Sequence, residues 1–426
     1  MVIRSLILLV FLTIVNLPFN HGQTESSEPL DVRAAYWPTF IDYPASNIDT
    51  SHFSHIYFAF VLPSPTTYVL NITPDHVTNL LEFTNAKSDW NPPAKTILSV
   101  GGGGGDDLRA TFSRMASNQY SRASFINSTI EVARKYQFDG IDLDWEYPSS
   151  DSDMANLGLL LNEWREAIEQ EANVNQKQRL ILTSAVYYAS RVYSDNGPLL
   201  YPIKAITQSV DWISPMCYDY HGSWENFTGL HSALYDPDSD LNTDFGIGSW
   251  IKAGVAPEKI VMGLPLYGKT WSLADPKVNN VGAKTIGTGP GSGELRYSEV
   301  IDFNKKNSAM VVFDDKRVSY YSYSGNSWMS YDDVRSIQSK VRYAKNQALS
   351  GYFLWALGQD LDWALSSAAS ETWSDRRLEK EDSDAKSTLA LLEAIPSLVT
   401  MLDSDDLDSQ IATLYILLNL GIDNNS

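Results

Sequence analysis

Short runs of apolar, β-branched and aromatic residues recur along the chain, with longer helix-like segments between them. This alternation is typical of parallel strands that are connected by helices. The runs predict eight strands, at residues 32–37, 55–60, 96–100, 140–145, 180–186, 212–217, 260–266 and 352–357. Eight such units predict an α/β fold, the (β/α)8 TIM barrel, whose active site lies at the C-terminal ends of the strands.

The segment between the seventh and eighth predicted strands is much longer than one connecting helix requires. Residues 310–313 and 318–323 predict further strands, and residues 332–346 predict a helix. An additional substructure is therefore expected between strands seven and eight.

The strongest candidate for chemistry is the stretch at residues 139–148, which ends the fourth predicted strand. Asp142, Asp144 and Glu146 alternate there with Leu143 and Trp145. Successive side chains of a strand point to opposite faces, so this spacing places the three carboxyl groups in one row. Such crowding raises the pKa of at least one carboxyl group, as a site needs when it donates a proton at neutral pH.

Two other interpretations of this acidic stretch are a Ca²⁺-binding loop and a solvated acidic edge. A Ca²⁺ loop requires a central glycine and oxygen-bearing side chains at alternate positions, where this chain has leucine and tryptophan. The pattern therefore favours a catalytic role.

These residues resemble the signature Asp-x-x-Asp-x-Asp-x-Glu of the family 18 glycoside hydrolases, the chitinase family. Three further motifs resemble that family in the same chain order. They are Ser99-Val100-Gly101-Gly102, Met216-Cys217-Tyr218-Asp219 and Gly351-Tyr352-Phe353-Leu354-Trp355. Over residues 30–373 the chain resembles plant-type class V chitinases, and the long segment at about residues 268–349 resembles their small α+β insertion.

The resemblance implies a retaining mechanism in which the substrate supplies the nucleophile. Most glycosidases need two carboxyl groups on opposite sides of the bond, and this family uses the N-acetyl group of the sugar instead. By resemblance, Glu146 is the general acid and Asp144 orients the acetamido group and stabilises the charge of the intermediate. Asp142 would pair with Asp144 and share a proton, and Tyr218 would donate its hydroxyl to the acetamido oxygen.

The resemblance also assigns residues that bind the substrate or support the site. Asp219 and Met216 would shape the sugar subsite, Trp355 would form its floor, and Tyr36 and Tyr57 are candidates for its wall. Supporting roles are expected for Ser99, which would hydrogen-bond near Asp142, for Gly101 and Gly102 in the turn after strand three, and for Asp139. By the alternation along a strand, Asp139 points to the face opposite the acidic row, which favours a structural role at the start of the strand.

Composition narrows the range of partners. A net charge of −20 argues against nucleic acid and anionic membranes, and is compatible with a neutral polymer such as chitin or a chito-oligosaccharide. The six histidines show no ligand spacing, so neither a metal nor a cofactor is expected. Cys217, the only cysteine, lies in an apolar run that predicts a buried thiol. A monomer is expected.

The first residues resemble a secretory signal peptide over residues 1–22. Arg4 precedes a short apolar run at residues 6–15, which is too short to favour a permanent membrane span. Three glycosylation sequons, at Asn71, Asn127 and Asn226, agree with passage through the secretory route. The mature protein is therefore expected outside the membrane, either extracellular (apoplastic) or vacuolar, with its catalytic domain at residues 23–373.

The C-terminal part has a different character. Residues 374–386 are mostly charged and predict a linker, whereas residues 387–426 contain two helical patterns that resemble a single armadillo repeat. Armadillo repeats are stabilised by neighbouring repeats, and about three are needed. A fused or mis-joined reading frame or a splice variant is expected, with a poorly ordered amphipathic tail as the alternative.

The leading hypothesis is a secreted, endo-acting chitinase. A non-hydrolytic lectin or inhibitor on the same scaffold is the main alternative, although relatives of that kind usually lose the equivalent of Glu146 or its neighbours. An endo-N-acetylglucosaminidase would use the same carboxyl groups. The hypothesis of an armadillo-type interaction protein rests only on the C-terminal tail.

Overall fold

Residues 31–194 and 197–375 are described by a computed structural model. The predicted signal peptide, most of the charged linker and the armadillo-like tail lie outside the described residues. Within the described ranges, no helix combines the length and the apolar composition that crossing a bilayer requires.

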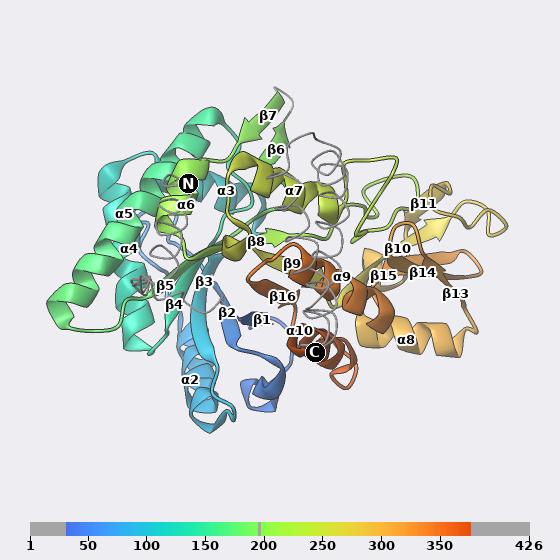
Figure 1. The fold of residues 1–426 in the computed structure, drawn as a ribbon, viewed down its shortest axis with the longest axis horizontal. Helices are drawn as coiled ribbons and strands as arrows, with labels where there is room; N and C mark the ends of the chain where they lie inside the picture. Colours follow the sequence, from blue (N-terminus) through green and yellow to red (C-terminus); the bar gives the residue numbers. More distant parts are fainter. Residues whose placement is uncertain (1–30, 195–196, 376–426) are drawn as a thin grey trace, which may run out of the picture. The chain divides into compact units, whose positions relative to one another are not determined.

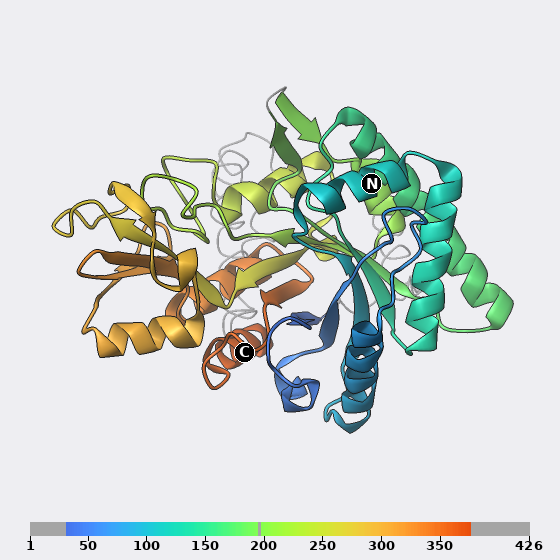
Figure 2. The ribbon, with the colours of Figure 1, turned by 180° about the vertical axis from the view of Figure 1, so that it is seen from behind.

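Eight parallel strands form the centre of the fold, as Figures 1 and 2 show. Their order is β8-β5-β4-β3-β2-β1-β16-β9, and a parallel bridge between Ile213 and Ile260 joins the two end strands. The strands are β1 (Val32–Pro38), β2 (His55–Val61), β3 (Lys95–Gly101), β4 (Gly140–Asp144), β5 (Ile181–Tyr187), β8 (Trp212–Met216), β9 (Val261–Pro265) and β16 (Gly351–Trp355). The predicted barrel is confirmed, and the strand bounds differ from the predicted ones by one or two residues.

Helices connect the barrel strands and surround them (Figure 1). They are α2 (Pro74–Asp89), α3 (Gly105–Ala116), α4 (Gln119–Lys135), α5 (Asp151–Asn175), α6 (Ile203–Ser209), α7 (Thr243–Ala253), α9 (Val334–Asn346) and α10 (Ala364–Ser374). The described residues also contain the 3₁₀ turns η1 (Ala45–Asn47), η2 (Thr50–His52) and η3 (Pro257–Lys259), and η4 (Pro290–Gly293) lies between β11 (Thr285–Thr288) and β12 (Glu294–Arg296) in the chain. Helix α5, which follows the acidic stretch, begins where the Ser150 side chain accepts a hydrogen bond from the backbone N–H of Asp153.

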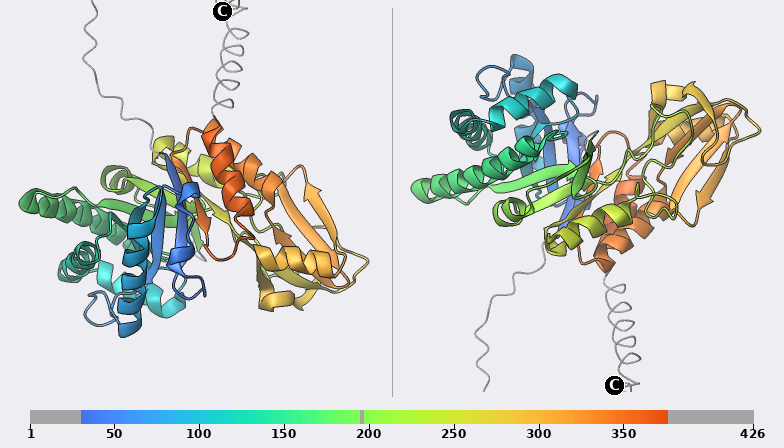
Figure 3. Two further views of the ribbon diagram at one scale, coloured as in Figure 1. Left: turned by 90° about the horizontal axis from the view of Figure 1, so that it is seen from below. Right: turned by 90° about the horizontal axis from the view of Figure 1, so that it is seen from above.

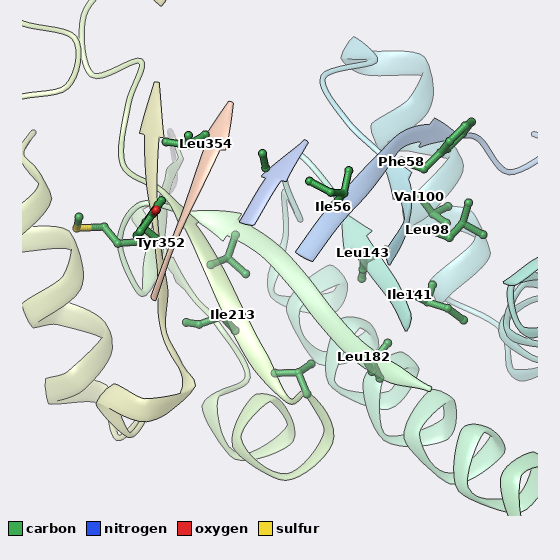
Figure 4. Packing of buried hydrophobic residues seen from close by; sticks show 14 of the residues in the cluster. Ile56, Phe58, Leu98, Val100, Ile141, Leu143, Leu182, Ile213, Tyr352 and Leu354 are labelled. Carbon is green, nitrogen blue, oxygen red and sulfur yellow. The ribbon is translucent and has the colours of Figure 1, made fainter. Parts of the chain in front are cut away.

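One face of each barrel strand supplies the apolar core. Figure 4 shows part of this cluster, with Ile141 and Leu143 of β4 beside side chains of the neighbouring strands. Because side chains alternate along a strand, Asp142 and Asp144 point to the opposite face, which is the interior of the barrel. The alternation of apolar and acidic residues in β4 therefore serves packing on one side and the site on the other.

A second sheet, in which all strand pairs are antiparallel, lies between β9 and β16 in the chain (Figure 3). Its strands are β10 (Tyr267–Leu273), β11 (Thr285–Thr288), β12 (Glu294–Arg296), β13 (Met310–Asp314), β14 (Ser319–Ser324) and β15 (Ser327–Tyr331), and α8 (Tyr297–Lys306) accompanies them. The predicted strands at β13 and β14 and the predicted helix at α9 are present. Trp271 and Trp328 are fully buried against each other in this sheet, which places them in its core.

A two-stranded hairpin follows the C-terminal end of β5. It consists of β6 (Arg191–Ser194) and β7 (Gly197–Leu200), which pair in antiparallel fashion and project at the edge of the fold (Figure 1). The sequence pattern did not predict this hairpin.

Candidate active site

A cavity of about 200 Å³ lies at the C-terminal ends of the barrel strands. Two carboxyl groups of the predicted row, those of Asp144 and Glu146, face it, together with Asp219. The full lining consists of Tyr36, Gly103, Asp144, Glu146, Tyr147, Ala185, Met216, Tyr218, Asp219, Tyr267, Phe353 and Trp355.

Asp142 lies beneath this cavity, fully buried inside the barrel. One oxygen accepts hydrogen bonds from the hydroxyls of Ser99 (2.7 Å) and Tyr36 (3.0 Å), and the other accepts one from Thr183 (2.7 Å). Burial raises the pKa of Asp142, and the hydroxyl donors, Thr183 first, oppose that rise. The predicted contact of Ser99 with Asp142 is present in this geometry.

The sharing of a proton between Asp142 and Asp144 stays a prediction. Both oxygens of Asp142 accept hydrogen bonds from hydroxyls on other strands, and a carboxylate oxygen has room for more than one donor. The two carboxyl groups also interact electrostatically, which is one of the causes that raise the pKa of Asp144.

Asp144 ends β4 and carries a buried oxygen, Oδ1, without a hydrogen-bond partner among the described residues. Burial raises the pKa of Asp144 well above its usual range, and the neighbouring carboxyl groups of Glu146 and Asp142 raise it further. A buried acceptor without a donor is costly, so this oxygen is suited to meet a donor that arrives with a ligand.

Glu146 lies beyond the end of β4, which stops at Asp144. The prediction that all three acids belong to one strand is therefore wrong in detail, although Glu146 still lines the cavity with Asp144. Burial, followed by the charge of Asp219, raises the pKa of Glu146 to about 7. A carboxyl group with this pKa can hold a proton at near-neutral pH and release it to a substrate.

The turn after β3 comes close to these acids because it is built of glycine. Gly101 has a φ of +125°, and a Cβ there would lie 1.9 Å from the carbonyl oxygen of Asp144. The Gly102 N–H donates to the same oxygen at 2.9 Å, and its φ is +96°. A side chain at Gly101 would displace the end of β4, whereas one at Gly102 would collide with the ring of Phe60.

Asp139 is located at the start of β4, away from the cavity. It accepts hydrogen bonds from the backbone N–H and hydroxyl of Thr96 (2.7 and 3.0 Å) and from Lys87 (2.8 Å). These contacts tie β3, β4 and α2 together, which agrees with a structural role.

The end of β8 contributes Met216 to the lining, and the residues that follow it contribute Tyr218 and Asp219, as the motif predicts. Burial raises the pKa of Tyr218 well above its usual range, so its hydroxyl stays protonated and able to donate. These three residues and the two acids converge on one small volume.

Asp219 is held in an ionised state by its neighbours. The hydroxyl of Tyr267 donates to it at 2.6 Å, Lys269 Nζ lies 3.2 Å away, and His231 lies 3.7 Å away. Burial acts to raise the pKa of Asp219, and His231 and Lys269 outweigh it, so the pKa is lowered. Lys269 also contacts Glu294 of the insertion at 2.9 Å, so the insertion takes part in fixing this side of the cavity.

Aromatic rings form the opposite side of the cavity. Trp355, at the end of β16, stacks on Phe60 with a centroid distance of 5.6 Å and lies 5.4 Å from Tyr36. Tyr57 does not reach the lining, which corrects its prediction as a wall residue. It is fully buried, stacks on Tyr36 at 4.4 Å and accepts a hydrogen bond from Trp212.

Five lining residues were missed by the sequence prediction. They are Gly103, Tyr147, Ala185, Tyr267 and Phe353. Two of them had a usable signal, because Tyr147 directly follows Glu146 and Phe353 lies two positions before Trp355, on the same face of its strand. Tyr267 belongs to the insertion, whose register the sequence pattern does not reveal.

The remaining predicted features lie outside the cavity. Asn71, Asn127 and Asn226 are exposed, and Cys217 is buried with a pKa that burial raises to about 12. In the described ranges, no three histidine, cysteine, aspartate or glutamate side chains are grouped so that they could hold a metal ion.

Comparison with known proteins gives the family. The model for "Glycosyl hydrolases family 18" matches residues 32–360. The chain belongs to glycosyl hydrolase family 18. A relative described as class V chitinase CHIT5a, from Medicago truncatula, is 50% identical over 376 residues, covering 86% of this chain and 97% of that protein.

Solved structures of family 18 proteins have the same fold. A class V chitinase from Nicotiana tobaccum, determined in complex with NAG4, aligns with a TM-score of 0.78 at 38% identity, covering 81% of this chain and 99% of that one. A chitinase-like agglutinin from Robinia pseudoacacia aligns with a TM-score of 0.74 at 38% identity, covering 80% and 100%. The fold therefore occurs both in proteins described as chitinases and in one described as an agglutinin.

Proposed function

We propose that this family 18 protein is a retaining chitinase that hydrolyses β-1,4 linkages between N-acetylglucosamine units. The observation that carries the proposal is a pair of carboxyl groups in one cavity with different tasks. Glu146 has a pKa of about 7, and Asp144 has a buried oxygen that finds no partner among the residues the structure describes. The relatives described as class V chitinases support the choice of substrate.

The charges around the cavity favour a nucleophile that belongs to the substrate. A two-carboxylate mechanism needs a second free carboxylate across the bond from the acid. Asp144 ends the strand that leads to Glu146, so it comes from the same edge of the cavity as the acid and not from across the bond. The third carboxylate of the lining, Asp219, is engaged by Tyr267 and Lys269. The acetamido group of the bound sugar can take the nucleophile's place.

In the first step, Glu146 gives its proton to the glycosidic oxygen, and the bond from that oxygen to the anomeric carbon breaks. The acetamido oxygen forms a bond to the same carbon, which gives a cyclic oxazolinium ion. Asp144 accepts the acetamido N–H and offsets the positive charge, and the hydroxyl of Tyr218 donates to the acetamido oxygen. Trp355 supports the apolar face of the sugar ring.

In the second step, a water molecule attacks the anomeric carbon from the side that the leaving group vacated. Glu146, now ionised, takes a proton from this water, and the bond to the acetamido oxygen breaks. Two inversions at one carbon leave the configuration retained. The acid is thereby protonated again for the next cycle.

We also propose that the enzyme is secreted and glycosylated. The three sequon asparagines are exposed in the folded domain, so a transferred glycan would not disturb its core. Exposure at Asn71, Asn127 and Asn226 supports this proposal together with the N-terminal sequence pattern. Glycosidase treatment of the secreted protein, followed by mass measurement, tests it.

The second candidate function is sugar binding without hydrolysis, which the agglutinin relative brings into consideration. The test is incubation of the protein with a hexamer of N-acetylglucosamine, with separation of products and anomers, beside Glu146→Gln. Cleavage to β-anomeric products by the wild type alone supports the chitinase. Binding without cleavage by either protein would favour the lectin.

A further inference from the structure

A buried histidine, His231, lies next to Asp219 without lining the cavity itself. Its side chain is fully buried, and neither ring nitrogen has a hydrogen-bond partner among the described residues. Nδ1 lies 3.7 Å from Oδ1 of Asp219, just beyond hydrogen-bonding distance. A buried imidazole without partners is costly, so a histidine at this position calls for a specific role.

Three groups approach the same oxygen of Asp219. The Tyr267 hydroxyl donates to Oδ1 at 2.6 Å, Lys269 Nζ lies 3.2 Å from it, and His231 Nδ1 is the third. The rings of His231 and Tyr267 also pack against each other, with a centroid distance of 5.1 Å. Because these groups gather at Oδ1, the other carboxylate oxygen is the one available to the cavity that Asp219 lines.

We propose that His231 is a positioning residue, which donates from Nδ1 to Oδ1 of Asp219 and so fixes the direction of this carboxylate at the cavity wall. The inference rests on the proposed chitinase function. The backbone φ of Asp219 is +58°, in the left-handed region that residues other than glycine rarely adopt, and such a conformation is retained where the surroundings hold it. Hydrogen bonds of active sites often tighten only in the complex with substrate, which suits a contact of 3.7 Å.

The backbone around the imidazole is fixed on both sides, so the ring is held toward Asp219. The N–H of His231 donates to Ser330 Oγ at 3.0 Å, and its carbonyl oxygen accepts from the backbone N–H of Tyr220 at 3.0 Å. The carbonyl oxygen of the next residue, Ser232, accepts from the buried ammonium group of Lys340. These contacts leave the imidazole nitrogens as the free polar atoms of this segment.

The role fits a neutral donor. Burial lowers the pKa of His231, so the ring is uncharged at neutral pH. Burial acts to raise the pKa of Asp219, and His231 comes first among the groups that lower it. The charged and titratable groups that surround the imidazole are Asp219 and Tyr220 after β8, Tyr267 and Lys269 of β10, Asp332 after β15 and Lys340 of α9.

The experiment compares His231→Leu with His231→Asn, two side chains of nearly the same shape that differ in one donor. An asparagine amide can place its nitrogen near the position of Nδ1, whereas leucine has only methyl groups there. With the hexamer of N-acetylglucosamine as substrate, His231→Leu should lower kcat roughly 3- to 10-fold, as expected for the loss of one hydrogen bond. His231→Asn should stay within about twofold of the wild type.

The pH profile gives a second reading of the same pair. In His231→Leu, Asp219 loses the first of the groups that lower its pKa, so it takes up a proton at a higher pH than in the wild type. The acidic limb of the kcat/KM profile should therefore move to higher pH in His231→Leu and stay in place in His231→Asn. An acidic limb that is unchanged in His231→Leu would contradict the proposal.

A double-mutant cycle with Asp219→Asn tests whether His231 acts through Asp219. In that background, His231→Leu should change kcat by less than about twofold, because the carboxylate that the imidazole positions is gone. Equal losses for His231→Leu and His231→Asn, or an undiminished loss in the Asp219→Asn background, would overturn the proposal.

His55→Leu is the matched control for folding. His55 begins β2, is 5% exposed, and its Nε2 also finds no hydrogen-bond partner in the described ranges. It lies at the opposite end of the barrel from the cavity, so His55→Leu should keep the wild-type kcat even where its melting temperature falls. If His231→Leu does not fold, His231→Gln takes its place, since its longer amide carries the donor away from the position of Nδ1 and should show the same loss of kcat. A wild-type protein that does not cleave the hexamer would instead overturn the chitinase function itself.

Discussion

Two levels of the barrel interior hold acidic residues of one sequence motif in opposite ways. At the lower level, Asp142 is fully buried and accepts hydrogen bonds from hydroxyls on three other strands. At the mouth, Asp144 has a buried oxygen that meets no partner within residues 31–194 and 197–375, and Glu146 has a pKa of about 7. Asp142 and Asp144 are only two residues apart, yet the first carboxyl group accepts hydrogen bonds at both oxygens and the second has an oxygen that accepts none from the described residues.

The difference indicates that the lower level of the barrel interior contributes to stability and that the mouth serves function. Hydrogen bonds to a buried carboxyl group stabilise the fold, whereas a buried acceptor without a partner costs stability in the absence of ligand. The lower level therefore fixes the shape of the barrel interior, and the mouth keeps its polar atoms available for the substrate. Substitutions at the two levels should have separable effects.

The largest effect on catalysis alone is expected for Asp144→Asn. The amide keeps the size of the side chain but cannot offset the positive charge of the intermediate, so kcat should fall about 10²- to 10³-fold, as when one preorganised electrostatic contact is removed. Because Asp144 has a buried acceptor without a donor, thermal stability should be unchanged or slightly raised. Steady-state kinetics and a melting curve on the same sample test both parts. A clear loss of stability with activity retained would contradict the assignment of Asp144 to function.

For Asp142→Ala, by contrast, we expect a clear loss of stability. The substitution removes the acceptor of Tyr36, Ser99 and Thr183, and each buried donor left without a partner costs about 1–3 kcal/mol. The free energy of unfolding, measured in urea, should fall by at least about 3 kcal/mol. Thr183→Val is the matched control, since it removes one donor from the same carboxyl group and should cost only about 1 kcal/mol. Equal losses for the two variants would show that the hydroxyls do not act together.

Much of the lower level could be predicted from sequence, because the repeat of two along a strand determines which residues point inward. The parity of β4 places Asp142 and Asp144 inside and assigns Asp139 to the other face, and the eight strands follow from their apolar runs. The wall of the cavity is harder to predict. Tyr36 and Tyr57 are paired neighbours of β1 and β2, yet only Tyr36 reaches the cavity. The stagger between strands decides which of them does, and no local pattern encodes that stagger.

The contribution of the insertion could not be predicted for a related reason. Tyr267 and Lys269 reach Asp219 from β10, the strand that directly follows β9. The sequence between residues 267 and 273 alternates like an ordinary strand, and its partner β15 is far away in the chain. Long-range pairing of this kind sets the charges at the mouth without leaving a motif.

The pH dependence of kcat/KM should report the protonation of Glu146 at the mouth of the barrel. Because burial and Asp219 raise the pKa of Glu146 to about 7, kcat/KM should fall as the pH rises through about 7 and the acid loses its proton. The folded state also binds this proton more tightly than the unfolded chain does. The resulting stabilisation is complete below about pH 4.5 and is lost as the pH rises to about 7.

Glu146→Gln provides the control for both measurements. Its melting temperature should vary less than that of the wild type between pH 4.5 and 7, because the titrating group is gone. An activity profile of the wild type that stays level up to pH 9 would contradict the assignment of Glu146 as the acid.

The smallest effects should come from the charges that surround Asp219, and their signs are opposite. Asp219→Asn removes a negative charge near Glu146, so the alkaline limb of the activity profile should move to lower pH. Lys269→Met leaves Asp219 charged and removes the cation 3.2 Å from it, so the same limb should move to higher pH, by less than about one pH unit. Lys269→Arg keeps the charge and should leave the limb where it is. Shifts of the same sign in Asp219→Asn and Lys269→Met would mean that the insertion affects the acid through structure and not through charge.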